Sequence, residues 1–299
     1  MKCPHTRSAA LVEVHRPVES RDVYLIQSMS PPVNDSLMEL YFALSALRRA
    51  GCKRLTAIVP YFGYGRQDRL THHGTTISAA DVARLLSCAG ADCVVSVDLH
   101  CGQLQGFFPL SCPSINLYGC AVAIKHFAQM RLRNPVVASP DAGGLERAKR
   151  FKENFENELK GQQCTDSDRN HSVEFALITK QRPQANEVGT MELLGDVSNS
   201  DVIIIDDLID TAGTLCKAAG ELKRMGANKV LAFASHGLFS KDAPEKIQCS
   251  ELEQVAVLDT VPQAESSSRC HKIVELSVAP LLADVVSRLR SGSDTSPLL

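Results

Sequence analysis

One stretch of the chain, residues 202–214, combines a predicted buried strand, two adjacent carboxylates and a turn of a size that suits a phosphate. Val202–Ile205 is a run of β-branched apolar residues, which predicts a strand of a parallel sheet covered on both faces. Asp206 and Asp207 follow where we expect that strand to end, and ligands bind at this edge of parallel sheets. The two carboxylates suit the hydroxyls of a ribose or a Mg²⁺ ion.

The residues after this acidic pair predict a phosphate-binding turn that opens a helix. The turn consists of Asp210, Thr211, Ala212, Gly213 and Thr214. Apolar residues then recur at helical spacing, and Gly226 is expected to end the helix. Free backbone N–H groups, two Thr hydroxyls and the helix dipole favour a phosphate at such a position, and Gly213 would let the backbone approach it closely. The alternative is an acidic strand-to-helix turn that is capped by Asp210.

Two further predicted strands also end beside groups that could bind a metal or a phosphate. In the segment SVDLH, Asp98 and His100 alternate after an apolar strand and could hold Mg²⁺ or a triphosphate, although a solitary His is more often structural. In the segment SPDAGG, Asp141 follows a strand and two glycines precede a helix. This second pattern has low specificity on its own.

Basic residues that suit a nucleotide occur at two places. The segment YFGYGRQDR contains Arg66, Gln67 and Arg69, which could stack on a base or hold phosphates, or could form a solvated basic turn. Lys180 and Arg182 follow a predicted strand and precede polar residues that are typical of a loop. Such a loop could close over a triphosphate and neutralise the charge that develops during phosphoryl transfer, or its cations could simply be solvated.

Length and composition favour an intracellular enzyme of two domains. The chain has 299 residues, and its net charge of −2 gives no reason to expect a nucleic acid or an anionic membrane as partner. No stretch approaches the roughly 20 apolar residues of a membrane span, and the apolar run Ala9–Val12 is too short for a signal peptide. The 11 cysteines are scattered without CxxC pairs, which favours small buried thiols in a reducing compartment. We therefore expect a cytoplasmic location.

Predicted strands and helices alternate along the chain. Apolar, β-rich runs predict strands at Tyr24–Gln27, Thr56–Val59, Val94–Asp98, Val136–Ser139, Phe175–Thr179, Val202–Ile205, Val230–Ala234 and Val255–Leu258. Leucines at helical spacing predict a helix that begins at Asn34 or Asp35 and ends at Gly51. Another helix is predicted to begin at Ser78, with a weak form of the capping box to Asp81. This alternation predicts an α/β fold with mainly parallel sheets.

A set of motifs along the chain resembles the ribose-phosphate pyrophosphokinase family, whose members make 5-phosphoribosyl-1-pyrophosphate. In chain order the motifs are PVNDSLMEL, VPYFGYGRQDR, VDLHCGQLQGFF, SPDAGG, TKQRPQANEV, IIDDLIDTAGT and SVAPLLA. The resemblance implies transfer of the β,γ-pyrophosphoryl group of ATP to the C1 hydroxyl of ribose 5-phosphate, with Mg²⁺ as cofactor and release of AMP. It also implies two tandem phosphoribosyltransferase-like domains and a homo-oligomer, most simply a hexamer.

The resemblance further implies roles for individual residues. ATP-binding positions match Arg66, Gln67, Asp68, Arg69 and His100. Metal-binding positions match Asp98, His100 and Asp141. The cations of the family's catalytic loop match Lys180 and Arg182. Ribose 5-phosphate would be bound by Asp206 and Asp207 at its hydroxyls and by Asp210, Thr211, Ala212, Gly213 and Thr214 at its phosphate.

We expect an ATP-side domain over residues 1–130, a ribose 5-phosphate-side domain over 131–278, and a C-terminal helix and tail over 279–299 that pack back on the first domain. The resemblance places the family's usual first strand, first helix and adenine-contacting loop before the start of this chain, so the first domain is expected to be truncated at its start. Glu19 and Gly74 stand where the family usually has basic residues, which bears on regulation by phosphate. The alternatives are a non-catalytic regulatory paralogue in a hetero-oligomer and a phosphoribosyltransferase that consumes the product.

Overall fold

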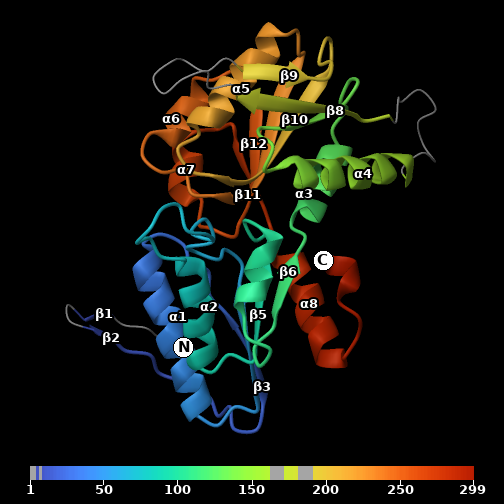
Figure 1. Cartoon of the computed structure of the whole chain (residues 1–299). Coiled ribbons are helices and arrows are strands. Elements are labelled where there is room, and N and C mark those ends of the chain that lie inside the picture. The colour runs from blue at the N-terminus through green and yellow to red at the C-terminus, as the bar shows by residue number, and fades with distance from the viewer. Residues whose placement is uncertain (1–4, 7–8, 162–171, 181–190) are drawn as a thin grey trace. The chain divides into compact units, whose positions relative to one another are not determined.

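The computed structural model describes residues 5–6, 9–161, 172–180 and 191–299. The chain divides into two units (Figure 1). The first comprises residues 1–118 together with residues 279–299, and the second comprises residues 119–278. Each unit is built on its own sheet, and all but one of the strand pairs in these two sheets are parallel. The predicted α/β class with mainly parallel sheets is therefore confirmed.

The first unit contains a sheet of parallel strands whose order follows the chain. The order is β3 (Asp22–Ile26), β4 (Arg54–Val59), β5 (Cys93–Val97) and β6 (Ser114–Leu117). The helices of this unit are α1 (Val33–Arg49), α2 (Ser78–Cys88), η1 (Gly102–Phe107), α8 (Ala279–Ser291) and η2 (Ser296–Leu298). A short antiparallel pair consists of β1 (His5–Thr6) and β2 (Ala9–Ala10). Because β3 to β6 are parallel, the loops that follow them leave from one edge of the sheet.

Helix α1 covers one face of this sheet, as its leucine stripe predicts. Leu40 and Leu44 are fully buried and share one hydrophobic cluster with Leu55 of β4 and Leu86 of α2. The helix ends before Gly51, whose φ of +76° is left-handed and costs glycine little. The predicted helix and its stop are therefore confirmed, whereas the predicted start at Asn34 or Asp35 is wrong, because the helix begins at Val33 with Pro32 in the cap position.

Helix α2 begins at Ser78 as predicted, but it is capped differently. Ser78 is already helical, and the residue in the cap position is Ile77, which makes no side-chain cap bond. The predicted capping box between Ser78 and Asp81 is therefore wrong. The backbone carbonyl of Gln67 accepts the N–H of Ala79 at 3.2 Å, so a loop far back in the sequence satisfies an N–H group at this helix start.

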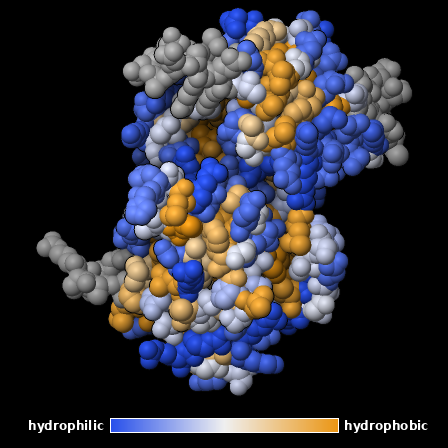
Figure 2. Space-filling view, viewed as in Figure 1, coloured by the Kyte–Doolittle hydropathy of each residue, from blue (hydrophilic) through white to orange (hydrophobic). Residues whose placement is uncertain are grey.

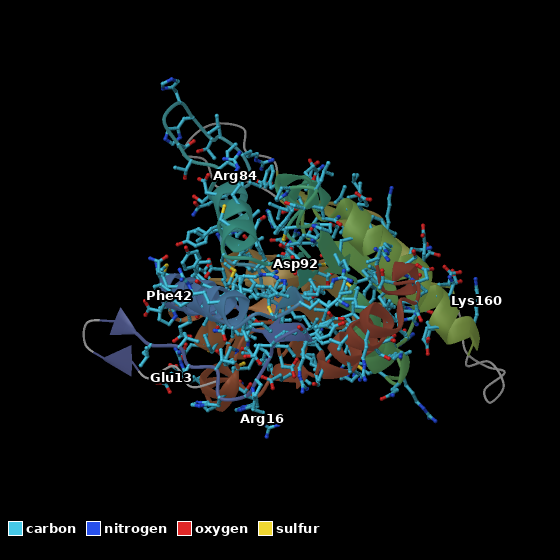
Figure 3. All side chains as sticks on the ribbon, turned by 90° about the horizontal axis from the view of Figure 1, so that it is seen from below. Glu13, Arg16, Phe42, Arg84, Asp92 and Lys160 are labelled. Atoms are coloured by element: carbon cyan, nitrogen blue, oxygen red, sulfur yellow. The ribbon has the colours of Figure 1, made fainter. Side chains whose placement is uncertain are left out.

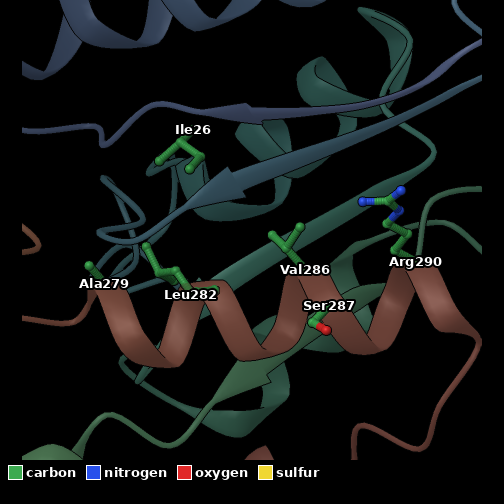
Figure 4. Close-up of a pocket in the computed structure, with 7 residues that line it drawn as sticks. Ile26, Ala279, Leu282, Val286, Ser287 and Arg290 are labelled. Atoms are coloured by element: carbon green, nitrogen blue, oxygen red, sulfur yellow. The ribbon is translucent and has the colours of Figure 1, made fainter.

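Helix α8 lies near Ile26 of β3, the edge strand of the sheet. Figure 4 shows Leu282 and Val286 on the side of α8 that faces Ile26. A groove of about 490 Å³ lies between them, and Arg290 is the only charged residue in its lining among the residues that the structure describes. Because this groove is apolar, it does not suit a phosphate or a metal ion, and the groups with that chemistry lie instead at the ends of strands.

The second unit contains a larger sheet. Its order is β13 (Ile273–Leu276), β12 (Gln254–Leu258), β11 (Lys229–Gly237), β10 (Asp201–Ile209), β7 (Val136–Ser139), β8 (Glu174–Lys180) and β9 (Met191–Leu194). Its helices are α3 (Cys120–Ala128), α4 (Leu145–Gly161), α5 (Gly213–Arg224), α6 (Ala243–Gln248) and α7 (Ala264–Arg269). Only β9 runs antiparallel to its neighbour among the described strands of this sheet.

Helices cover both faces of this second sheet. Phe233 of β11 stacks with Phe151 of α4, with ring centroids 6.5 Å apart. The adjacent residues Ala232 and Ala234 belong to a different cluster that contains Leu215 of α5. Since successive side chains of a strand point to opposite faces, α4 and α5 lie on opposite sides of the sheet. The prediction of a strand covered on both faces is confirmed.

The central strand β10 is longer than the sequence predicts. It runs to Ile209 and is paired with β11 as far as Ile209 and Gly237, whereas its pairing with β7 stops at Ile204. The apolar run thus ends where one of the two neighbouring strands ends. The prediction that the strand stops before Asp206 is wrong, because the acidic pair belongs to β10 itself.

Three short strands of the two larger sheets, β6, β9 and β13, were not predicted, and neither was the pair β1 and β2. The sequences of β6, β9 and β13 are SINL, MELL and IVEL, and each includes a polar or charged residue in a run of four. Their positions beside longer strands, rather than their own composition, place them in the sheets. No helix in the described part of the chain is both long and apolar enough to span a membrane.

The surface in view mixes hydrophilic and hydrophobic residues (Figure 2). Large apolar side chains that are exposed include Leu70, Leu110 and Leu194. Phe42 of α1 also lies at the surface, where it is 39 % exposed, as does the charged side chain of Arg84 of α2, which is 73 % exposed (Figure 3). Such isolated apolar residues are ordinary on protein surfaces and carry no functional meaning by themselves.

Candidate active site

The most developed group of polar side chains surrounds the acidic pair of β10. Asp207 is buried, and its backbone N–H donates to Oδ1 of Asp206 at 2.9 Å. Burial and the neighbouring charge of Asp207 raise the pKa of Asp206 to about 7. Near neutral pH the pair therefore carries less than two full negative charges. Adjacent carboxyl groups of this kind can accept hydrogen bonds from neighbouring hydroxyls of a sugar.

A cation that the sequence analysis did not identify lies beside this pair. Nη1 of Arg147, in the first turn of α4, lies 3.4 Å from Oδ1 of Asp207. The two side chains are only 16 % and 9 % exposed, so the ion pair is largely removed from water. Arg147 also acts on Asp206, whose pKa it lowers against the larger opposing effect of burial. Its helical position six residues after Asp141 gave no motif by which to find it.

The turn that carries Asp141 packs against the same strand. Oγ of Ser139 donates to the backbone carbonyl of Asp141 at 2.7 Å, and Oδ1 of Asp141 accepts the N–H of Gly144 at 3.0 Å. A side chain at Gly144 would place its Cβ 3.1 Å from Oγ of Ser139 and 3.9 Å from the carbonyl oxygen of Ile205. The absence of a Cβ at Gly144 thus lets this turn lie close to Ser139 of β7, the strand that pairs with β10. The sequence SPDAGG is therefore part of the same site as the acidic pair.

The segment after β10 forms the predicted turn into helix α5. Ala212, immediately before the helix, adopts a left-handed conformation with φ of 57°, and it has no side-chain acceptor for the first N–H groups of the helix. A Cβ at Gly213 would meet nothing within 4 Å, so open space lies beside the start of α5. An exposed helix start with room beside it suits an anion such as a phosphate.

A segment at the end of β11 supports this turn and was missed by the sequence analysis. The N–H of Leu238 donates to the carbonyl of Ile209 at 2.8 Å, and the N–H of Ser240 donates to the carbonyl of Asp210 at 3.0 Å. A Cβ at Gly237 would lie 2.5 Å from the ring of Phe239. A side chain at 237 would therefore displace the buried ring of Phe239 in the same segment. The repeated backbone contacts fix the base of the turn.

The cations after β8 are only partly described. Lys180 is the last residue of that strand, three positions after Leu177, which is in register with Ser139 of β7. The backbone of Lys180 thus lies beyond the same edge of the sheet as the Asp141 turn. Arg182 lies outside the described residues.

In the first unit, two segments that the sequence analysis selected lie together. Sγ of Cys101 donates to Oδ2 of Asp68 at 3.2 Å. A Cβ at Gly65 would lie 3.7 Å from Cβ of His100, so the loop that carries Arg66 passes next to the residue after β5. The segments 65–68 and 98–101 therefore form one group at the edge of the first sheet.

The side chains of this group differ in exposure. Arg66, Gln67 and His100 are exposed, and the Arg69 side chain is 82 % exposed with its Nε 3.8 Å from Oδ1 of Asp68. Asp98 is buried and has a positive φ of 41°. Exposed cations and an imidazole suit the phosphates of a nucleotide, whereas Asp98 sits deeper in the fold.

The three residues predicted to bind metal are divided between the units. Asp98 and His100 belong to the first unit and Asp141 to the second. Within the described ranges, no group of three or more His, Cys, Asp or Glu side chains could hold a metal ion by itself. Mg²⁺ commonly binds one or two carboxylates and completes its shell with water and substrate phosphates. Asp141 is exposed, and its Oδ1 accepts the N–H of Gly144. Its Oδ2 is therefore the oxygen that suits a Mg²⁺ ion whose other ligands are water and substrate phosphates.

Comparisons with known proteins agree over most of the chain. Residues 6–90 match the N-terminal domain of ribose phosphate pyrophosphokinase, and residues 133–299 match the phosphoribosyl synthetase-associated domain. The ribose-phosphate pyrophosphokinase of Nitrosomonas europaea is 40% identical over 289 residues, which cover 96% of this chain and 86% of that protein. The chain belongs to the ribose-phosphate pyrophosphokinase family.

Other members of the family give the same result. The ribose-phosphate pyrophosphokinase of Shewanella oneidensis is 42% identical over 288 residues, with 96% of this chain and 86% of that protein covered. The crystal structure of phosphoribosylpyrophosphate synthetase from Mycobacterium smegmatis superposes with a TM-score of 0.83 at 32% identity. That likeness covers 97% of this chain and 89% of the other, and it confirms the predicted pair of phosphoribosyltransferase-like domains.

Proposed function

We propose that the protein transfers the β,γ-pyrophosphoryl group of ATP to the C1 hydroxyl of ribose 5-phosphate and releases AMP. The observation that carries the proposal is the arrangement at the end of β10. The carboxylates of Asp206 and Asp207 and the open helix start at Gly213 follow one another on a single strand and turn. Membership in the ribose-phosphate pyrophosphokinase family supports the same reaction.

The second unit is the proposed ribose 5-phosphate side. Asp206 and Asp207 accept hydrogen bonds from the ribose hydroxyls, and the turn from Asp210 to Thr214 wraps the 5-phosphate. The N–H groups at the start of α5 and the helix dipole stabilise the phosphate charge. The left-handed conformation of Ala212 sets the direction in which the turn enters the helix.

The first unit, with residues 279–299, is the proposed ATP side. Arg66, Gln67 and Arg69 are exposed at one strand edge beside His100 and can bind the base and the triphosphate. Asp68 contributes indirectly, since its carboxylate accepts the thiol hydrogen of Cys101 and so joins the two segments.

The proposed chemistry needs placement and charge stabilisation rather than a covalent intermediate. The C1 hydroxyl oxygen bonds to the β-phosphorus, the bond from that phosphorus to the oxygen bridging the α-phosphate breaks, and the hydroxyl proton is lost to solvent. Lys180 and Arg182 stabilise the charge that develops on the transferred group. Bound Mg²⁺ would neutralise part of the triphosphate charge. Asp98 and His100 are the residues proposed to bind metal in the first unit, and Asp141 is the residue proposed to do so in the second.

Assembly and location remain proposals that rest on family membership. We propose a homo-oligomer, a hexamer in its simplest form, in the cytoplasm. The partners are ATP and ribose 5-phosphate, with no nucleic acid or membrane among them.

The test is release of AMP from MgATP by the purified protein, with and without ribose 5-phosphate. The proposal expects AMP only when Mg²⁺, ATP and ribose 5-phosphate are all present. Folded protein that binds ribose 5-phosphate without turnover would contradict it and would favour the regulatory paralogue. A phosphoribosyltransferase would instead consume 5-phosphoribosyl-1-pyrophosphate when a nucleobase is supplied.

A further inference from the structure

Arg147 and Asp207 form an ion pair that is almost closed to solvent. Their Nη1 and Oδ1 atoms are 3.4 Å apart, and the side chains are 16 % and 9 % exposed. Removing a guanidinium and a carboxylate from water is unfavourable unless each compensates the other. The Asp207 carboxylate is thus held by a group on a separate helix as well as by its own strand.

The helix that carries Arg147 is itself fixed against the site. α4 begins right after the Asp141 turn, where Oδ1 of Asp141 accepts the N–H of Gly144 at 3.0 Å, and Ala148 and Phe151 of the helix are fully buried. The start of α4, which carries Arg147, is therefore bonded to the Asp141 turn and packed into the core. The ion pair connects two parts of the site that the sequence motifs treat as separate.

Position distinguishes Arg147 from the other cations of its helix. Lys149 and Arg150 are exposed, whereas Arg147 faces the end of β10. Its guanidinium acts on both carboxyl groups of the acidic pair, through direct contact with Asp207 and through its charge on Asp206. One buried cation therefore partly neutralises two adjacent acids and fixes the orientation of one of them.

We infer that Arg147 is a positioning residue for ribose 5-phosphate, which holds the Asp207 carboxylate so that the acidic pair can accept hydrogen bonds from the ribose hydroxyls. Arg147 acts through Asp207 and does not touch the reacting atoms. The inference rests on the proposed function, because it assigns the acidic pair to the ribose.

The test compares Arg147→Gln and Arg147→Lys with Lys149→Gln, a matched loss of one positive charge on an exposed position of the same helix. Steady-state kinetics give kcat and both KM values, and urea unfolding gives the stability of each variant. Arg147→Gln should raise KM for ribose 5-phosphate about tenfold or more, the scale seen when a residue that orients a ligand-binding group is lost. KM for ATP should change much less. Arg147→Lys should recover most of the loss, and Lys149→Gln should behave like the unaltered protein.

A double-mutant cycle with Asp207→Asn tests whether Arg147 acts through Asp207. Once Asp207 carries no charge, Arg147→Gln should add little further loss, so the two effects should be clearly non-additive. If Arg147→Gln does not fold, Arg147→Met keeps the unbranched stem and takes its place.

Additive effects would overturn the inference, and so would equal rises in both KM values. The inference would also be overturned if Arg147→Gln had the same kcat and KM values as Lys149→Gln. Unaltered protein that binds no ribose 5-phosphate would contradict the proposed function itself, which keeps the two failures distinguishable.

Discussion

The two strand-edge groups differ in how deeply their side chains are buried. In the second unit, a largely buried ion pair and backbone hydrogen bonds hold the acidic pair and the phosphate turn. In the first unit, Arg66, Gln67 and His100 are exposed, and a contact between the Cys101 thiol and the Asp68 carboxylate joins their segments. The ribose side is therefore preorganised and largely buried, whereas the side chains of Arg66, Gln67 and His100 on the nucleotide side lie at the surface. Substitutions in the two regions should accordingly affect different ligands and by different amounts.

The largest expected effect lies in neither ligand-binding group. Lys180 is the last residue of β8, and its charge is proposed to act on the transferred phosphoryl group rather than to bind either substrate in the ground state. Lys180→Ala should lower kcat by about 10²- to 10³-fold with much smaller changes in both KM values. Stopped assays of AMP formation at saturating substrate measure this. Lys160→Ala, at the far end of α4 and 52 % exposed, is the control, and near-normal kcat in Lys180→Ala would show that this cation is only solvated.

The preorganised side should respond next most strongly. Asp207→Ala removes an acceptor for the ribose and leaves Arg147 without its contact. Loss of a hydrogen bond to a charged group corresponds to roughly 10- to 150-fold in affinity for ribose 5-phosphate. The affinity for ATP alone, measured by calorimetric titration, should change little. Equal losses for the two ligands would mean that the acidic pair is assigned to the wrong one.

The exposed side should show the opposite selectivity and a smaller effect. Arg66→Gln keeps a polar group of similar length and removes the charge proposed to contact ATP. Because an exposed cation gains less from a contact than a buried one, we expect about a tenfold loss of ATP affinity at most. The affinity for ribose 5-phosphate should be unchanged. Arg84→Gln, which removes a charge that is 73 % exposed on α2, is the matched control, and an equal loss of ATP affinity in that variant would contradict the assignment.

The last expected effect concerns stability and pH rather than the affinity for a ligand. Asp206 has a pKa raised to about 7 in the folded protein by burial and by Asp207, whereas an Asp in the unfolded chain titrates near pH 4. Between these values the folded state binds more protons than the unfolded state, so the stability contributed by protonated Asp206 is lost as pH rises toward 7. The free energy of unfolding should fall by roughly 1–3 kcal/mol between about pH 5 and pH 8, relative to Asp206→Asn. Parallel urea curves for the two proteins would instead show that Asp206 is ionised throughout.

Long strands and the apolar stripes of helices could be predicted from the sequence more successfully than the residues at which elements begin and end and the segments that contact those ends. The leucine stripe of α1 and the apolar core of β10 depend on periodicity, which is local. The end of β10 at Ile209 depends on how far β11 extends beside it, and the start of α2 depends on the carbonyl of Gln67. Both β11 and Gln67 are too far along the chain from the ends that they determine for a local sequence pattern to include them.

The same limit applies to the site. The motifs selected the acidic pair, the DTAGT turn and the Asp141 turn, because strand ends and glycines carry a strong local signal. They did not select Arg147, since a cation in the first turn of a helix resembles any solvated residue until packing places it at 3.4 Å from Asp207. Nor did they show that Ala212, rather than Gly213, takes the left-handed conformation. The assignment of these residues to the two substrates stays a prediction.

The most direct test of pyrophosphoryl transfer follows the phosphorus atoms of ATP. The protein is incubated with MgATP and ribose 5-phosphate, with radioactive phosphorus placed at the α position in one sample and at the β position in another, and the products are separated. The account predicts that the α label is recovered in AMP and the β label in the sugar product. Recovery of the β label in ADP, or no labelled sugar product from folded protein, would contradict it.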